Sequence, residues 1–412
     1  MSPENTILII GGKLKIVRKA KALGLDVLYF QHKSQFSGEH LDLVGAAVLV
    51  DYRDPAKLRP LAQAAHAAWG FASVLSLTEP GLLPAAMVND MFGLTGTSCE
   101  VNRRFMDKWV MRQRLAAAGT PSIAAAPVAG PESLSDFGKT HGYPFIVKPA
   151  SGAGSAGVTL VDGVADIDPT WRKIIGLREA ADSPWALFCT IDEFIMESYV
   201  PGPEYSIEAF SFAGRHVIVA ITEKSVRPGS FVEVGHALPA RISHEVEEAI
   251  VQATTDFLDA LELRDGPTHT EVRVGPDGPV VIESHNRVGG DRISELVEEA
   301  YGIDLDTYAI GWPFRLVEEL PCRPQPKGAA ATRFLVAEPG RVVHVGDTSM
   351  ARMCRDVIDL EVNVRVGDTV GRLCDSSGRL GQVVAIGVDT DSAIGACAAA
   401  LGELEIETRQ EA

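Results

Sequence analysis

The sequence predicts an α/β protein of several domains, and three observations support this. The chain has 412 residues, enough for two to four domains, and 46% of them are hydrophobic, as in ordinary globular proteins. Residues 1–97 alternate short apolar runs with amphipathic stretches, which is typical of a parallel sheet covered by helices. After residue 145, short strands punctuated by Gly and Pro are mixed with helical patterns, which indicates an α+β remainder.

The overall charge and the cysteines restrict the partners and the compartment. With 38 basic and 55 acidic residues the net charge is −17, which argues against non-specific binding to nucleic acid or to an anionic membrane. The six cysteines lie far apart without a C-x-x-C pair, so neither a zinc site nor a disulfide framework is expected. No signal sequence and no apolar run of about 20 residues is recognisable, and we expect a cytoplasmic protein.

The first 97 residues are predicted in order as strand, helix, strand, strand and helix. Strands are expected over residues 7–10, 27–30 and 46–50, with a helix over residues 14–23. The pair Asp54-Pro55 is a typical helix start and Gly70 a typical end. Because no G-x-G-x-x-G follows the first strand, the unit is predicted to be Rossmann-like without binding a nicotinamide dinucleotide.

The later elements are predicted from periodicity and turn residues. One continuous helix is expected over residues 102–118, with Asn102 as its N-cap, and a shorter one over residues 132–141. A long amphipathic helix starts at Ser243, and strands over residues 269–274 and 280–285 flank a turn. Beyond residue 327 we expect short Val-rich strands and a closing helix over residues 392–401.

The most informative segment follows a buried strand at residues 145–148. Lys148 ends this strand, and a loop with three glycines and two serines begins directly after it. Glycines let backbone N–H groups turn towards a phosphate, and the lysine adds a positive charge. The lysine precedes the glycines, which disfavours a P-loop nucleotide hydrolase.

Two carboxylates flank the Pro-Gly turn at residues 201–202. After this turn Glu204, Ser206 and Glu208 lie on one face of a predicted strand. This spacing fits a solvated edge and equally a pair in which Glu197 and Glu204 hold the adenine and the ribose of a nucleotide.

The hairpin at residues 269–285 allows a geometric argument. If Pro276-Asp277-Gly278 forms a three-residue loop, Glu271 lies directly opposite Glu283. Two like charges in that position repel unless a cation lies between them, and few hard oxygen ligands suit Mg²⁺. A two-residue loop would place the two glutamates on opposite faces.

Taken in order, these motifs resemble the ATP-grasp superfamily of carboxylate–amine ligases, especially its amino-acid ligases and its biotin-carboxylase-like branch. The resemblance covers roughly residues 100–320 by motif. It implies a Rossmann-like pre-ATP-grasp domain over residues 1–97 and a two-lobed ATP-grasp domain. The N-lobe with a glycine-rich lid loop would span residues 98–195, the C-lobe with the metal hairpin residues 196–326, and a small β-rich C-terminal subdomain residues 327–412.

The resemblance also implies roles for individual residues. The nucleotide would be bound by Lys108, Lys148, Ser151, Gly152, Gly154, Ser155, Gly157, Glu197, Tyr199, Val200 and Glu204. The metal would be held by Glu271 and Glu283, with Asn286 or His285 as third ligand, because His285 stands where the family's E-x-N-x-R pattern has its Asn. Lys148 and Arg287 would be catalytic, and the substrate would contact His236, Arg287, Gly289 and Gly290; His236 lies in a segment similar to a substrate-proximal loop.

The function implied by this resemblance is an ATP-dependent ligase that forms carbon–nitrogen bonds. ATP with Mg²⁺ or Mn²⁺ would convert a carboxylate into an acyl phosphate, which an amine then attacks to give an amide, ADP and phosphate. Amino acids or a small peptide are the expected substrates, and a homodimer is the expected assembly. Two alternatives stay open: an enzyme that activates bicarbonate or formate, and a nucleotide-binding protein without catalysis.

Overall fold

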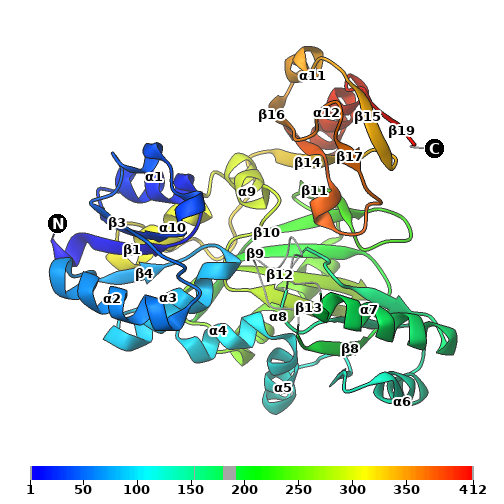
Figure 1. The fold of residues 1–412 in the computed structure, drawn as a ribbon, viewed down its shortest axis with the longest axis horizontal. Coiled ribbons are helices and arrows are strands. Elements are labelled where there is room, and N and C mark those ends of the chain that lie inside the picture. Colours follow the sequence, from blue (N-terminus) through cyan, green and yellow to red (C-terminus); the bar gives the residue numbers. More distant parts are fainter. Residues whose placement is uncertain (1, 153, 180–191, 411–412) are drawn as a thin grey trace.

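The computed structural model describes residues 2–152, 154–179 and 192–410, and its N-terminal part is a parallel sheet flanked by helices (Figure 1). The strands β1 (Thr6–Ile10), β2 (Asp26–Gln31), β3 (Ala46–Leu49) and β4 (Ser73–Leu75) lie in the order β3-β2-β1-β4. The helices are α1 (Leu14–Ala22), α2 (Pro55–Trp69) and α3 (Glu79–Phe92). The Asp54 carboxylate accepts a hydrogen bond from the Ala56 N–H and caps α2. The expected Rossmann-like arrangement is confirmed.

A four-stranded antiparallel sheet forms the second unit. Its strands β5 (Ala125–Pro127), β6 (Phe145–Pro149), β7 (Thr159–Val161) and β8 (Phe194–Ser198) lie in the order β5-β8-β6-β7. Helices α6 (Pro131–His141) and α7 (Ile167–Glu179) share a core with this sheet, in which Phe137, Phe145 and Ile174 are buried. Sequence periodicity did not predict α7. The glycine-rich segment joins β6 to β7.

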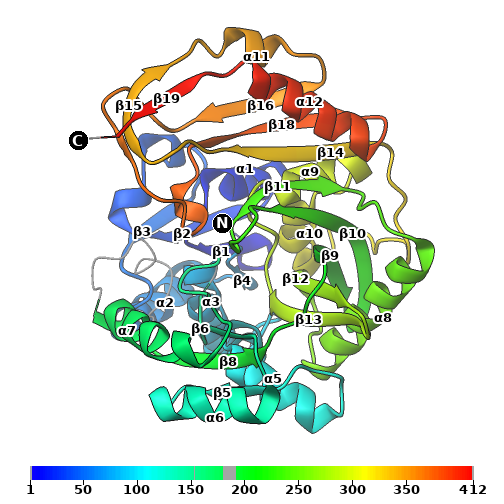
Figure 2. The same ribbon diagram turned by 90° about the vertical axis from the view of Figure 1, so that its right-hand side faces the viewer.

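The third unit is an eight-stranded sheet in the order β13-β12-β9-β10-β11-β14-β18-β16 (Figure 2). Its strands are β9 (Glu204–Phe212), β10 (Arg215–Val226), β11 (Glu233–Leu238), β12 (Gly266–Gly275), β13 (Gly278–His285), β14 (Ala329–Leu335), β16 (Val357–Val362) and β18 (Gly381–Gly387). The predicted C-terminal subdomain therefore continues the sheet of the C-lobe, because β11 pairs with β14 from Gly235–Arg333 to Leu238–Ala330. A small sheet of β15 (Gly340–Val345), β17 (Thr369–Val370) and β19 (Ile406–Arg409) lies beside it.

The remaining helices pack on these sheets and close the core. They are α4 (Cys99–Met106), α5 (Lys108–Ala118), α8 (His244–Ala260), α9 (Ile293–Tyr301), α10 (Leu305–Gly311), α11 (Ser349–Met353) and α12 (Thr390–Gly402). Ser243 caps α8 as expected. Buried residues of α1, β1, β9, α9 and α10 form one hydrophobic cluster, so the N-terminal sheet and the eight-stranded sheet share a core. This contact places the start of α3 beside the end of β13.

The predicted continuous helix over residues 102–118 is wrong, because the helix is broken at Asp107. Ser98 rather than Asn102 caps α4, and its hydroxyl accepts from the Val101 N–H. Asp107 has extended backbone angles, and its carboxylate accepts from the N–H groups of Trp109 and Val110, so a second helix begins at Lys108. Within the described ranges, no helix has the length and apolarity needed to cross a bilayer.

Candidate active site

A buried carboxylate between two cations forms the N-lobe side of the site. Lys148 lies on β6 and Glu197 on the neighbouring β8, and the Lys148 Nζ is 2.6 Å from one Glu197 oxygen. The Arg112 Nε, from α5, is 2.7 Å from the other oxygen. Burial alone would raise the pKa of Glu197, but Arg112 and Lys148 outweigh it and the pKa is lowered. Glu197 is thus held ionised, and Arg112 is a site residue that the sequence motifs missed.

The break at Asp107 is what brings Lys108 to the site. The Lys108 N–H donates to the Ala150 carbonyl at 2.9 Å, which ties the start of α5 to the glycine-rich loop. Its Nζ is 2.9 Å from the Glu283 Oε2 and 3.0 Å from the Gly152 carbonyl oxygen. Burial alone would lower the pKa of Lys108, but nearby carboxylates, Glu283 first, outweigh burial and raise it. Lys108 therefore links the glycine-rich loop of the N-lobe to the predicted metal hairpin of the C-lobe.

The metal hairpin has the predicted facing pair, but a different turn produces it. Gly275 pairs with Gly278, so the loop has two residues rather than the predicted three. A two-residue loop alone would turn Glu271 and Glu283 to opposite faces. A β-bulge at Ile282 inserts one extra residue, and beyond it Glu271 pairs with Glu283. The bulge thereby restores the register on which a shared cation site depends.

Arg112 also holds this bulge. Its Nη1 donates to the Val281 carbonyl at 2.9 Å and its Nη2 to the Ile282 carbonyl at 2.6 Å. The side chain is almost fully buried, and a third nitrogen binds Glu197. One guanidinium thus fixes Glu197 of the N-lobe sheet and the irregular hairpin of the C-lobe.

Replacing Arg112 by Met is expected to lower the stability of the protein strongly. The change would leave Glu197 buried with one cation and two carbonyl oxygens without their donor, which typically costs about 3–5 kcal/mol. Thermal and urea unfolding of the variant would measure this loss. Arg114→Met, on the same helix but half-exposed beside Glu262, is the control and should cost far less. Equal losses in the two variants would contradict the anchoring role of Arg112.

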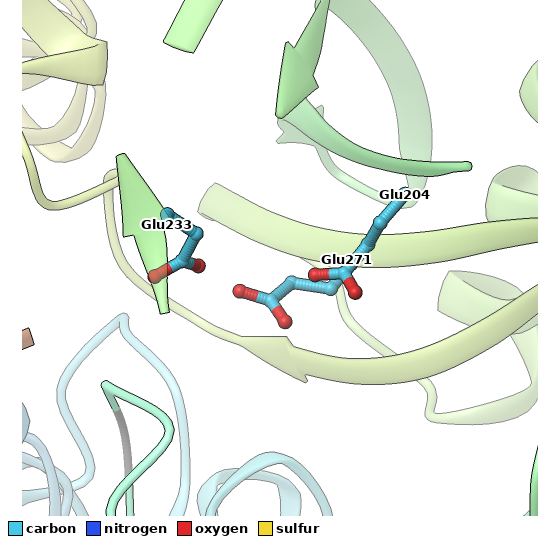
Figure 3. A group of neighbouring side chains, drawn as sticks. All are labelled: Glu204, Glu233 and Glu271. Carbon is cyan, nitrogen blue, oxygen red and sulfur yellow. The ribbon is translucent and has the colours of Figure 1, made fainter. Parts of the chain in front are cut away.

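Three carboxylates, those of Glu204, Glu233 and Glu271, lie close together (Figure 3), and Lys224 on β10 contacts all three. Its Nζ is 2.9 Å from Glu204, 3.2 Å from Glu233 and 2.6 Å from Glu271. Carboxylate oxygens of these three glutamates lie within 4.8 Å of one another. Burial alone would lower the pKa of Lys224, but the carboxylates raise it well above its usual value, while burial raises the pKa of Glu204. The Lys224 ammonium group supplies the positive charge that these three carboxylates require. The sequence motifs did not predict this residue.

A histidine lies beside each of the two carboxylates that are predicted to bind the metal. On β12, the His269 Nδ1 is 2.5 Å from the Glu208 Oε1, and its Nε2 is 3.5 Å from the Glu271 Oε1. Burial alone would lower the pKa of His269, but Glu208 and Glu271 raise it to about 9. The pKa of Glu271 is lowered to about 2, because Lys224 and His269 outweigh its burial.

The second histidine lies opposite the first and connects to the N-terminal sheet. The His285 Nε2 is 3.5 Å from the Glu283 Oε1, and its Nδ1 is 3.2 Å from the Oε1 of Glu79 at the start of α3. The other Glu79 oxygen accepts from the Arg287 Nε at 2.7 Å. Burial alone would raise the pKa of Glu79, but His285 and Arg287 lower it well below its usual range. Glu79 is a third site residue outside the sequence motifs.

The first cavity of the site, of about 100 Å³, lies between the two lobes. Nine residues predicted to bind nucleotide line it: Lys108, Lys148, Gly152, Gly154, Ser155, Glu197, Tyr199, Val200 and Glu204. Ser151 and Gly157, also predicted, do not line it. Gly157 has a φ of +76°, and a Cβ there would lie 3.0 Å from the Pro149 Cγ, so the glycine serves the path of the loop.

A larger cavity of about 360 Å³ adjoins the first and is lined by three parts of the chain. Glu79 comes from the start of α3, Arg287 and Gly290 from the segment after β13, and Arg379 from the C-terminal part. The predicted substrate residues His236 and Gly289 line it as well. The structure thus brings all four predicted substrate-binding residues to one cavity.

Three details of the predictions are corrected here. His236 does not lie in a substrate-proximal loop but is buried in β11, with its Nε2 3.4 Å from Asp291, which Arg379 also binds. The Gly289 N–H is already donated to a Glu208 oxygen at 3.1 Å. Asn286 lines a separate cavity with residues such as Asn89 and Trp312, so its side chain is directed away from the paired carboxylates. Of the two candidates for the third ligand, only His285 lies beside Glu283.

Comparison with known protein families agrees with this geometry. Residues 141–295 match the model of the ATP-grasp domain, residues 17–96 that of the ATP-grasp N-terminal domain, and residues 333–409 that of the L-amino acid ligase C-terminal domain 2. The chain belongs to the ATP-grasp superfamily. The family assignment made from the sequence motifs is confirmed, as is the mixed α/β fold class.

This ATP-grasp protein is also similar to individual proteins along much of its length. An uncharacterized protein y4rH of Sinorhizobium fredii is 29% identical over 326 residues, which cover 78% of this chain and 65% of the relative. Alanine–anticapsin ligase of Bacillus subtilis is 26% identical over 251 residues, which cover 58% of this chain and 52% of that enzyme. The chain thus spans about half to two thirds of the length of these relatives. The crystal structure of an L-amino acid ligase from Bacillus licheniformis has the same fold, with a TM-score of 0.82, 23% identity, and coverage of 98% of this chain and 99% of that one.

Proposed function

We propose that this ATP-grasp protein is an ATP-dependent carboxylate–amine ligase that forms an amide bond and releases ADP and phosphate. An acyl phosphate would be the intermediate, and amino acids or a small peptide the substrates. The ligase activities in the names of related proteins support this proposal. Its structural support is the relation between the two cavities.

The two cavities meet at the paired carboxylates, and this observation carries the proposal. Glu233, Glu271, Glu283 and Gly154 line both of them. The first cavity is lined by the lysines and by the glycine-rich loop, as a triphosphate requires, and the second is of small-molecule size. A phosphoryl group that leaves a nucleotide in the first cavity would therefore reach a carboxylate in the second without crossing solvent.

Charge stabilisation is the main task of the first cavity. Phosphoryl transfer needs positioning and positive charge rather than a nucleophilic side chain. Lys108 and Lys148 line the first cavity and Lys224 lines the second; all three ammonium groups are buried, and each is now paired with a glutamate. When a nucleotide binds, these ammonium groups would also interact with its phosphate oxygens.

The donor set also fits a divalent cation. Glu271 and Glu283 face each other on adjacent strands, and without a cation two partly buried like charges in that position would repel. A bound Mg²⁺ or Mn²⁺ would supply further positive charge to the phosphate oxygens. Lys224 and Lys108 hold the two carboxylates ionised and facing the cavity.

The second cavity would position the acid and the amine. The Arg287 guanidinium is only partly satisfied by Glu79 and the Val288 carbonyl and would orient a substrate carboxylate. His236, Asp291 and Arg379 form a connected polar wall contributed by β11, the loop after β13 and the C-terminal part. Closing such a site excludes water, which would hydrolyse an acyl phosphate.

The acyl phosphate predicts a specific trapping result. Incubation with ATP, MgCl₂, hydroxylamine and each of the twenty amino acids should give a hydroxamate with every acid that also stimulates phosphate release. Hydroxylamine traps the activated carboxyl group in place of the amine. The ferric hydroxamate colour and ADP formation measure the two products.

Two outcomes would contradict this function. Phosphate release that depends on an acid but never yields a hydroxamate would exclude an acyl phosphate. ADP release that depends on bicarbonate alone, without an amine, would instead favour the bicarbonate-activating alternative. Asp136→Asn changes an exposed residue on α6 that lines neither cavity. This variant should form hydroxamate and ADP as the wild type does, and it controls for losses during purification.

We also propose a cytoplasmic location and small-molecule partners for the enzyme. Five cysteines in the described ranges are free thiols, which fits a reducing compartment: Cys99, Cys322, Cys354, Cys374 and Cys397. The expected homodimer remains a proposal, and size-exclusion chromatography with light scattering would test it.

A further inference from the structure

At the predicted metal site, the imidazole of His285 lies beside Glu283. The usual Mg²⁺ ligands in proteins are instead oxygen atoms of carboxylates and amides. His285 follows Glu283 by two residues, so both side chains lie on the same face of β13. Asn286, the oxygen alternative, lines another cavity. The chemistry of the site therefore depends on what His285 does.

We propose that the Nε2 of His285 is a ligand of the divalent cation, and that the site consequently prefers Mn²⁺ to Mg²⁺. The inference rests on the proposed function only for the presence of a cation at the phosphate end of the site. It goes beyond that function by assigning a nitrogen ligand and a metal preference.

The contacts of Glu283 are the first argument. Its Oε2 is bound by the Lys108 Nζ at 2.9 Å, whereas its Oε1 has the His285 Nε2 as its neighbour at 3.5 Å. That distance is longer than a good hydrogen bond. It suits two ligands of one ion, because atoms each roughly 2.1 Å from a common metal lie about 3–3.5 Å apart. An oxygen and a nitrogen thus lie side by side in a position to bind the same cation.

The other ring nitrogen gives the second argument. The His285 Nδ1 is 3.2 Å from Glu79, a buried carboxylate that is itself fixed by the Arg287 Nε at 2.7 Å. Metal-binding histidines typically donate their second ring N–H to a carboxylate in this way, which sets the tautomer that leaves the first nitrogen free for the metal. Glu79 is therefore the positioning residue of the proposed ligand.

His269 has similar contacts but is not assigned as a ligand. Its Nε2 is 3.5 Å from the Glu271 Oε1, and that oxygen is already bound by the Lys224 Nζ at 2.6 Å. An ammonium group therefore lies where a cation would have to bind between His269 and Glu271. His269 is buried to the same degree as His285 and stands opposite it in the hairpin, so it is a matched control.

The preference for Mn²⁺ follows from the nitrogen donor. Mg²⁺ takes hard oxygen ligands and octahedral geometry, whereas imidazole favours first-row transition metals. Among these, Mn²⁺ also accepts carboxylate and phosphate oxygens. A site with one imidazole and carboxylates should therefore bind Mn²⁺ more tightly than Mg²⁺.

The decisive experiment detects the nitrogen directly and needs no turnover. The full-length protein is loaded with MnCl₂ and inorganic tripolyphosphate, which contains no nitrogen, and studied by electron spin echo envelope modulation. We expect the ¹⁴N modulation of a directly bound imidazole in the wild type and in His269→Gln, and its loss in His285→Asn. Calorimetric titration should show that His285→Asn loses at least about tenfold in Mn²⁺ affinity and little in Mg²⁺ affinity.

The results separate this proposal from the proposed function. Absence of the imidazole signal in the wild type, or its persistence in His285→Asn, would overturn the assignment of His285. Loss of the signal in His269→Gln alone would overturn it as well. Hydroxamate formation is independent of these readouts: a trapped hydroxamate without the ¹⁴N signal would retain the ligase and reject the nitrogen ligand. The converse result would reject the ligase and retain the ligand.

Discussion

Replacing Lys148 by Met is expected to lower the rate of ADP formation by about 10²–10³-fold. The Lys148 side chain is buried at the first cavity, and the charge that develops on the transferred phosphoryl group would lose one of its fixed cations. The fold should persist, because Arg112 still pairs with Glu197. Phosphate release with an accepted amino acid, together with circular dichroism of the folded variant, measures both effects.

The control for Lys148 is a lysine of the same lobe outside the cavity. Lys139→Met removes an exposed ammonium group on α6 that pairs only with Asp136 among the described residues, and should leave the rate unchanged. A Lys148→Met variant that turns over at the wild-type rate would remove this lysine from the active site. So would an equal loss in both variants.

Replacing Lys224 by Met should abolish turnover and also lower the thermal midpoint by at least about 6 °C. The change leaves Glu204, Glu233 and Glu271 together without the ammonium group that lies between them. Three carboxylates so close could then bind a divalent cation in its place. CaCl₂ should therefore raise the thermal midpoint of Lys224→Met more than that of the wild type, as measured by scanning fluorimetry.

A second substitution tests the reason for this loss. Glu233→Gln in the Lys224→Met background removes one of the three charges and should recover part of the lost midpoint while it weakens the response to CaCl₂. If Lys224→Met were as stable as the wild type, the three carboxylates would not need the ammonium group. If Glu233→Gln lowered the midpoint further by its full single-variant effect, the two residues would act independently.

The hairpin of β12 and β13 was predicted only in part from the sequence. The facing of Glu271 and Glu283 was predicted from a three-residue loop, and the pair does face, but through a two-residue loop and the bulge at Ile282. The two changes of register cancel, so the conclusion was right although its premise was wrong. Nothing in the local sequence marks the bulge, because the Arg112 guanidinium that holds it comes from α5, far away in the chain.

Residues missed by the motifs share one property, which is burial next to another part of the chain. Arg112 and Lys224 have buried charged groups within a helix and a strand, where one sequence cannot distinguish them from ordinary surface residues. Glu79 meets His285 only because the N-terminal sheet packs on the C-lobe. In contrast, Lys148 and the glycine loop were predictable, since their chemistry is local to one strand and one turn. The break at Asp107 was missed because the apolar pattern continues through it.

The eight-stranded sheet makes the C-terminal part inseparable from the C-lobe. If the chain ended at the predicted domain boundary, β11 would become an open edge, with backbone groups from Gly235 to Leu238 no longer paired to β14. His236 would also lose the Arg379 that holds its partner Asp291. An exchange of C-terminal parts between relatives could therefore succeed only if the incoming strand docks on β11 in the same register. The C-terminal residues that line the second cavity therefore cannot be exchanged independently of the C-lobe.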